Sequence, residues 1–130
     1  MSTDEFIELA NRLADVSGPV IRSYFRVPGN IDDKQDGSPV TAADREAEAA
    51  IRAILSTERP QDGIIGEEFG SANPDAEFVW VIDPIDGTQS FIAGRPIFGT
   101  LISLVRDQTP IIGIIDQPVN RERWSGAKGR

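Results

Sequence analysis

The segment with the most chemical character is Asp83-Pro84-Ile85-Asp86-Gly87-Thr88, which directly follows an apolar run. The apolar run predicts a strand that delivers Asp83 at its end. Pro84 disfavours helix at the preceding residue and favours a turn, which brings Asp86 round three residues later. Two carboxylates on one tight turn can bind one or two hard cations.

The last two residues of the same segment suit an anion. Gly87 permits a close approach of the backbone to a ligand, and Thr88 can begin a short helix. Free backbone N–H groups at the start of a helix can bind phosphate. Metal ligands and phosphate donors would then be neighbours, as phosphoester hydrolysis requires.

Two other interpretations of this segment remain open. Asp-Pro-x-Asp-Gly is also favourable chemistry for a surface turn. The haloacid-dehalogenase type of phosphatase likewise has an Asp…Asp-Gly-Thr after an apolar strand, and its first aspartate is a nucleophile. Its two aspartates are two residues apart, whereas Asp83 and Asp86 are three apart with Pro84 between them.

Two acidic segments precede this one. Glu67 and Glu68 follow a short apolar run and stand between glycines. Adjacent acids in a strand point to opposite sides, so one of the two would face a metal; the alternative is a solvated acidic loop. Thr41-x-x-Asp44 fits a capping box, in which the acid serves only a helix N-terminus. Lys34, in the loop before it, would ordinarily be a solvated lysine.

The residue types that are absent narrow the chemistry. The 130-residue chain has no Cys and no His, which excludes thiolate nucleophiles, Cys-based zinc sites, a Ser-His-Asp triad and a phosphohistidine within it. Any metal must be bound by oxygen, which favours Mg²⁺, Mn²⁺ or Ca²⁺. The net charge of −8 argues against binding to nucleic acid or to an anionic membrane.

The sequence predicts neither a signal peptide nor a membrane span. The N-terminus lacks the basic region and apolar core of a signal peptide, and no apolar run approaches the roughly 20 residues of a membrane span. A cytoplasmic location is therefore expected.

Helices and strands must position these residues. Apolar side chains recur at three- and four-residue steps over residues 6–25 and again from about Thr41 to Arg59, which predicts two amphipathic helices. Short β-branched runs follow and predict strands at Ile64-Ile65, Phe78–Ile82, Phe98–Val105 and Ile111–Ile115. Arg106–Pro110 suits a hairpin connection between the last two. The pattern predicts one α+β domain, with two N-terminal helices packed on a mostly antiparallel sheet.

Taken together and in this order, three segments resemble the inositol monophosphatase family. They are Pro39-Val40-Thr41-Ala42-Ala43-Asp44, Gly66-Glu67-Glu68 and Trp80-Val81-Ile82-Asp83-Pro84-Ile85-Asp86-Gly87-Thr88. The resemblance spans essentially all of residues 1–130 but only the N-terminal half of a typical member. It implies a single metal-binding phosphatase domain, truncated, that forms the N-terminal half of a layered αβαβα sugar-phosphatase-type fold.

The resemblance implies a metal site. Glu67, Asp83 and the backbone carbonyl of Ile85 would bind the first Mg²⁺, and Asp83 would bridge to a second that it shares with Asp86. Glu67 would also reach a third, weaker metal, and Mn²⁺ could replace Mg²⁺. Glu68 matches the second acid of the pair, which usually lies outside the ligand set.

The resemblance also implies the residues around the substrate. Asp44 and Thr88 would orient the attacking water, and Lys34 would lie near it. The backbone N–H groups of Gly87 and Thr88 would bind the phosphate. Gln89 lies beside the phosphate site, at a position where one branch of the family often has Arg or Lys.

That branch is the histidinol-phosphatases, which the chain resembles in three segments: Phe91–Ile102, Gly113–Pro118 and Glu122-Arg123-Trp124. The implied activity is direct in-line attack of a metal-activated water on a small phosphorylated metabolite, histidinol phosphate, as in histidine biosynthesis, without a phosphoenzyme. The alternatives are inositol 1-phosphate or another sugar phosphate, and a non-catalytic metal-binding fragment. The full-length form is expected to be a homodimer.

Overall fold

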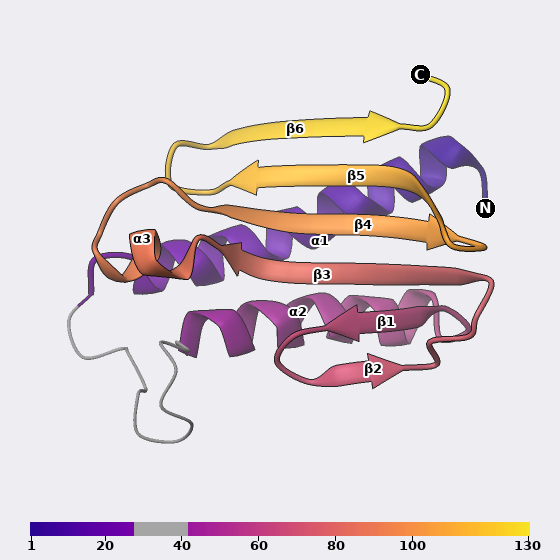
Figure 1. The fold of residues 1–130 in the computed structure, drawn as a ribbon, viewed down its shortest axis with the longest axis horizontal. Coiled ribbons are helices and arrows are strands. Elements are labelled where there is room, and N and C mark those ends of the chain that lie inside the picture. Colours follow the sequence, from indigo (N-terminus) through magenta and orange to yellow (C-terminus); the bar gives the residue numbers. More distant parts are fainter. Residues whose placement is uncertain (28–41) are drawn as a thin grey trace.

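Two long helices lie side by side against one face of a single sheet in the computed structural model, which describes residues 1–27 and 42–130 (Figure 1). They are α1 (Thr3–Tyr24) and α2 (Ala42–Glu58), and both were expected from the apolar periodicity. Ser2 caps α1 in a capping box, because its side chain accepts from the Glu5 N–H while the Glu5 side chain accepts from the Ser2 N–H. No helix in the described ranges is long and apolar enough to cross a membrane.

The sheet has six strands in the order β2-β1-β3-β4-β5-β6. The bounds are β1 (Gly63–Gly66), β2 (Gly70–Ala72), β3 (Phe78–Asp86), β4 (Gly99–Arg106), β5 (Thr109–Gln117) and β6 (Glu122–Ala127), and a short helix α3 (Thr88–Ile92) follows β3. Only β1 and β3 pair in parallel, so the sheet is mostly antiparallel as predicted. The predicted β4–β5 hairpin turns at Asp107 and Gln108, both at positive φ, as a two-residue primed turn requires.

The main core lies between the helices and the sheet. Trp80 of β3 is its largest fully buried side chain. Its indole Nε1–H donates to Asp62 over 3.0 Å, and Arg59 donates to both oxygens of the same carboxylate over 2.8 Å. The buried polar atoms beneath the indole are therefore satisfied, which makes burial of so large a side chain favourable.

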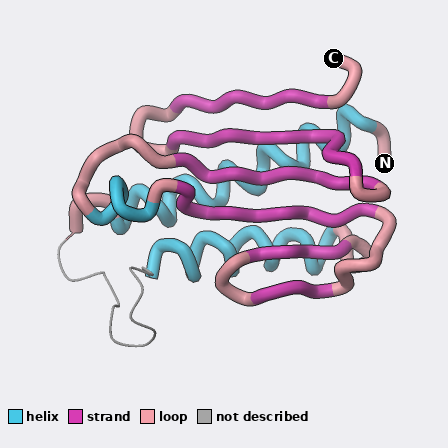
Figure 2. Tube along the Cα trace, viewed as in Figure 1, coloured by secondary structure: helices cyan, strands magenta, loops and turns pink. Residues whose placement is uncertain are grey.

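The opposite side of the sheet, which we call the open face, carries no helix from the described residues (Figure 2). Asp83, Leu101, Ile115 and Trp124 are register partners across four neighbouring strands, so their side chains share this face. Ile115 and Trp124 are half exposed. These four residues line a groove of about 550 Å³.

Candidate active site

One end of the sheet brings together the chain segments that hold the predicted site. The strands β1 and β3 are parallel, so both end there, and α2 begins and α3 lies at the same end (Figure 1). Residues far apart in sequence, in α2, in the β1–β2 turn and after β3, therefore meet. A site built from Asp44, Glu67 and Asp83 would lie at this end of the sheet.

A β-bulge shapes the end of β3. Between Asp83 and Asp86, the two residues Pro84 and Ile85 lie opposite Thr100 alone. The buried Thr100 hydroxyl donates to the Pro84 carbonyl over 2.8 Å and holds the bulge in place. Ile85 packs on the helix side of the sheet, so the exposed Asp86 points away from the helices. The bulge thus returns Asp86 to the side of the sheet on which Asp83 lies.

Gly87 and Thr88 begin α3, as the sequence predicted. Gly87 has φ 97°, and a Cβ there would lie 2.9 Å from the Ile97 carbonyl oxygen, so glycine is required by both conformation and space. Its carbonyl accepts from the Phe91 N–H over 3.1 Å. The Thr88 hydroxyl donates to the Ile85 carbonyl over 3.3 Å. Phosphate binding at this turn stays a prediction.

The carboxylate of Asp83 is the electrostatic centre of the site. Among the described side chains, its Oδ1 is the only buried oxygen or nitrogen with no hydrogen-bond partner. Burial raises the pKa of Asp83, and the nearby carboxylates of Glu67 and Asp86 raise it further, whereas a backbone hydrogen bond from Ile85 lowers it. A buried, unpartnered oxygen among like charges is an unfavourable arrangement that a cation would relieve. The residues therefore fit a divalent metal.

Asp44 lies in the first turn of α2 and is 5% exposed. Burial raises its pKa to about 7, and the carboxylates of Glu68, Asp83 and Glu67 contribute in the same direction, against a backbone hydrogen bond from Ile85. The Asp44 carboxylate is therefore near the other carboxylates, and its catalytic role stays a prediction. Thr41, its partner in the predicted capping box, lies outside the described residues, as does Lys34.

The expectation that Glu67 and Glu68 are adjacent residues of a strand was wrong. They lie in the turn between β1 and β2. Gly66 pairs with Gly70, so three residues reverse the chain and the alternation of a strand does not apply. Glu67 is exposed, whereas the Glu68 side chain is largely buried and lies 3.8 Å from Arg45. The two acids still have different environments, for a different reason from the one predicted.

The metal ligands themselves remain a prediction. Over residues 1–27 and 42–130 no three acidic side chains stand close enough together to hold one ion in this structure. The carboxylates of Glu67 and Asp86 are near enough to Asp83 to raise its pKa, and binding of one ion by all three would need their side chains to move closer together. Gln89 is exposed on α3 beside Thr88, where a substrate could reach it.

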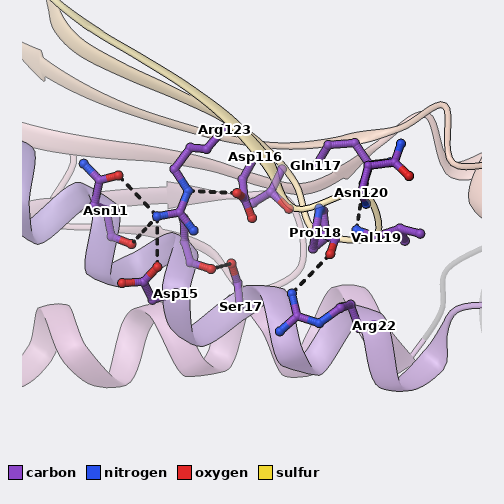
Figure 3. Close-up of polar contacts among 12 residues, drawn as sticks. Asn11, Asp15, Ser17, Arg22, Asp116, Gln117, Pro118, Val119, Asn120 and Arg123 are labelled. Carbon is purple, nitrogen blue, oxygen red and sulfur yellow. Dashed lines mark hydrogen bonds and ion pairs between the residues drawn. The ribbon is translucent and has the colours of Figure 1, made fainter.

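The segments that resemble the histidinol-phosphatase branch have structural contacts in this molecule (Figure 3). Arg123 of β6 donates to Asp116 of β5 over 2.8 Å and to Asp15 of α1 over 2.9 Å. The Gln117 carboxamide accepts from two N–H groups of the β5–β6 turn and donates to the Pro96 carbonyl over 2.8 Å. These contacts fasten the last hairpin to α1 and to the segment after α3.

Comparisons with known proteins agree with this fold. The sequence profile of the inositol monophosphatase family matches residues 2–130. The chain is 53% identical over 129 residues to the bifunctional phosphatase IMPL2, chloroplastic, of Arabidopsis thaliana, covering 98% of this chain and 37% of that protein. It is 41% identical to a histidinol-phosphatase of Mycobacterium tuberculosis, covering 100% of this chain and 50% of the relative. An inositol monophosphatase structure from Zymomonas mobilis matches with a TM-score of 0.85 and 56% identity, covering 99% of this chain and 49% of the other.

The fold is that of the inositol monophosphatase structure from Zymomonas mobilis over 99% of this chain. The chain belongs to the inositol monophosphatase family. It spans about half or less of the length of the relatives named above.

Proposed function

We propose that the chain forms the metal- and phosphate-binding half of a Mg²⁺-dependent phosphomonoesterase that hydrolyses histidinol phosphate. The observation that carries the proposal is the buried Asp83 Oδ1, which has no hydrogen-bond partner and lies near the carboxylates of Glu67 and Asp86. An oxygen-only ligand set of this charge suits Mg²⁺. The 41% identity to a histidinol-phosphatase supports the substrate.

The proposed roles follow from where the residues lie. Glu67, Asp83, Asp86 and the Ile85 carbonyl would hold the metal, which when bound would act as a Lewis acid on the phosphate and on a water molecule. Asp44, which is buried in the first turn of α2 with its carboxylate near those of Glu68 and Asp83, would accept a hydrogen bond from the attacking water and fix its direction.

The start of α3 would bind the other reactant. The backbone N–H groups of Gly87 and Thr88 stand at a helix start, where orphan donors favour an anion. The Thr88 hydroxyl, which donates to the Ile85 carbonyl, can still accept a hydrogen bond from the water. Together these groups would bind the phosphate and orient the water for attack on it.

A second substrate class has its own support. The Zymomonas mobilis inositol monophosphatase is 56% identical to this chain, so inositol 1-phosphate is the main alternative. Gln89 beside the phosphate turn is neutral, where the histidinol-phosphatase branch often has a cation. Substrate preference therefore has to be measured and not inferred from the phosphate turn.

The test is a phosphate-release panel with histidinol phosphate, inositol 1-phosphate and a sugar phosphate, with Mg²⁺ or excess chelator. It is run on the chain alone and on the chain joined at Arg130 to the C-terminal half of the Zymomonas mobilis relative. The joined protein should prefer histidinol phosphate and lose activity in chelator. Higher turnover of inositol 1-phosphate would reject the substrate, and full activity in chelator would reject the metal mechanism.

Two matched variants test the central residue. Asp83→Asn should abolish Mg²⁺ binding, followed by calorimetry, together with activity, because it removes the charge at the unpartnered oxygen. Asp75→Asn, an exposed aspartate away from the site, should change neither. An Asp83→Asn protein with activity within about tenfold of wild type would contradict the role, since loss of a metal ligand removes far more than that.

A further inference from the structure

Glu48 of α2 is an unexpected neighbour of the candidate site. Its side chain is 0% exposed, although a carboxylate is among the most unfavourable groups to bury. It lies one helical turn after Asp44, so both project from the same face of α2. A buried carboxylate at this place requires strong partners, and the structure supplies them.

The partners are backbone amides of the β1–β2 turn. The Glu68 N–H donates to one oxygen of the Glu48 carboxylate and the Phe69 N–H donates to the other, each over 3.1 Å. Arg52, one turn further along α2, donates to the same carboxylate over 3.0 Å. Both oxygens are thus used, and two consecutive peptide groups of the turn are held directly by α2.

Gly66 shows how closely the turn approaches. A Cβ at this position would lie 2.5 Å from the Glu48 carboxylate carbon, so any other residue would displace the Glu48 carboxylate from its place against the turn. Arg52 holds the far side of the turn, since its guanidinium also donates to the Gly70 carbonyl. The turn that carries Glu67 is therefore held at the three residues that follow Glu67, namely Glu68, Phe69 and Gly70, by the side chains of Glu48 and Arg52.

We propose that Glu48 is a positioning residue that sets the place of the Glu67 carboxylate beside Asp83, by fixing the backbone of the turn from α2. The consequence for metal binding rests on the proposed function. Ala47, on the same helix, packs in one buried cluster with Ile85 of the other acid-bearing turn. One face of α2 thereby sets the spacing between the Glu67 turn and the Asp83–Asp86 turn.

The first readout needs no metal. In Glu48→Gln, the carboxamide can accept from one turn amide but presents N–H groups to the other, so amide hydrogen exchange at Glu68 and Phe69 should accelerate at least about tenfold. Amides of β4 and β5 should keep their rates. Leu55→Ala, a core change on the same helix, is the control: it should lower overall stability without a selective effect on the turn. Equal acceleration of all amides in Glu48→Gln would overturn the proposal.

The second readout is Mg²⁺ affinity by calorimetry, which a general loss of stability would not move while the protein stays folded. Glu48→Gln should weaken binding about 10–100-fold, as loss of a group that orients a metal ligand does. Leu55→Ala should leave the affinity unchanged. Unchanged affinity in Glu48→Gln would also overturn the proposal.

Gly66→Ala reaches the same contact from the other side and serves where Glu48→Gln does not fold. Its Cβ displaces the Glu48 carboxylate from the turn amides while the residue itself is kept, so it should reproduce the faster local exchange and the weaker Mg²⁺ binding. Wild-type exchange and wild-type affinity together would overturn the proposal. Failure of wild-type protein to bind Mg²⁺ would reject the proposed function, and Glu48 would then be judged on the exchange data alone.

Discussion

Replacing Asp44 by asparagine should change how the stability of the metal-free protein depends on pH. In the folded wild type, burial and the carboxylates of Glu68 and Asp83 raise the Asp44 pKa from 3.8 to about 7. The folded state therefore binds a proton that the unfolded chain releases at lower pH. This contribution to stability is complete below pH 3.8 and is lost as pH rises to about 7.

The magnitude follows from the two pKa values. Between pH 5 and the folded pKa of about 7, the wild type should lose about 3 kcal/mol of unfolding free energy through this group, at about 1.4 kcal/mol per pH unit. Asparagine has nearly the same shape and does not titrate. The difference in stability, Asp44→Asn minus wild type, should therefore rise by about 3 kcal/mol from pH 5 to pH 8.

The assay is urea unfolding in excess chelator at pH 5 and pH 8, followed by the fluorescence of Trp80, which is fully buried. The exposed Asp75→Asn is the control and should show a pH-independent difference. The reasoning about the acidic site is refuted if the stability difference between Asp44→Asn and wild type changes by less than about 0.5 kcal/mol from pH 5 to pH 8. A change of that size is typical of an ordinary surface substitution. In an active form of the enzyme, Asp44→Ala should lower kcat heavily, whereas loss of a helix cap alone would cost about 0.5–2 kcal/mol of stability and spare the chemistry.

Three further predictions follow from the bulge, the open face and the length of the chain. Thr100→Val should lower the free energy of unfolding by about 1–3 kcal/mol, because it leaves the buried Pro84 carbonyl without its hydrogen-bond donor. Urea unfolding measures this loss, with the exposed Thr109→Val as the control. Equal losses of stability in the two variants would contradict the prediction. The chain alone should self-associate through the open face. Ile115→Lys should therefore lower the mass measured by light scattering, whereas Thr109→Lys should not. A wild-type chain that is monomeric would contradict this prediction. The chain alone should release phosphate from histidinol phosphate far more slowly than an ordinary enzyme rate of about 10 s⁻¹, and turnover near that rate from a monomer would show that the site is complete without further residues.

Much of the fold was predictable from the sequence because its signals are local. The spacing of apolar residues predicted α1 and α2, and the β-branched runs predicted β1, β3, β4 and β5. The strands β2 and β6 were missed. Gly-Ser-Ala in β2 is exposed throughout, and β6 is exposed over most of its length, so neither has the alternation by which a strand is identified. Backbone pairing with a neighbour holds them instead.

The site was predictable only in part, for a similar reason. Asp83 and Asp86 stand in a distinctive local pattern, and the bulge and short helix follow from it. Glu48 has no local pattern, because a glutamate on a helix is usually solvated. Its burial depends on a turn twenty residues away in sequence, and only the spacing of four from Asp44 hinted that it faces the same way.

The bulge at Pro84 and Ile85 has a consequence for how this site can change through mutation. In a regular strand, side chains two residues apart lie on one face of the sheet. Because of the bulge, Asp83 and Asp86 lie on one face although they are three residues apart. The extra residue adds a peptide group, and with it the Ile85 carbonyl that is predicted to bind metal. That oxygen belongs to the main chain, so exchange of the Ile85 side chain would not delete it. Removal of one codon could do so while leaving both aspartates in place, which makes chain length here a separate determinant of metal binding.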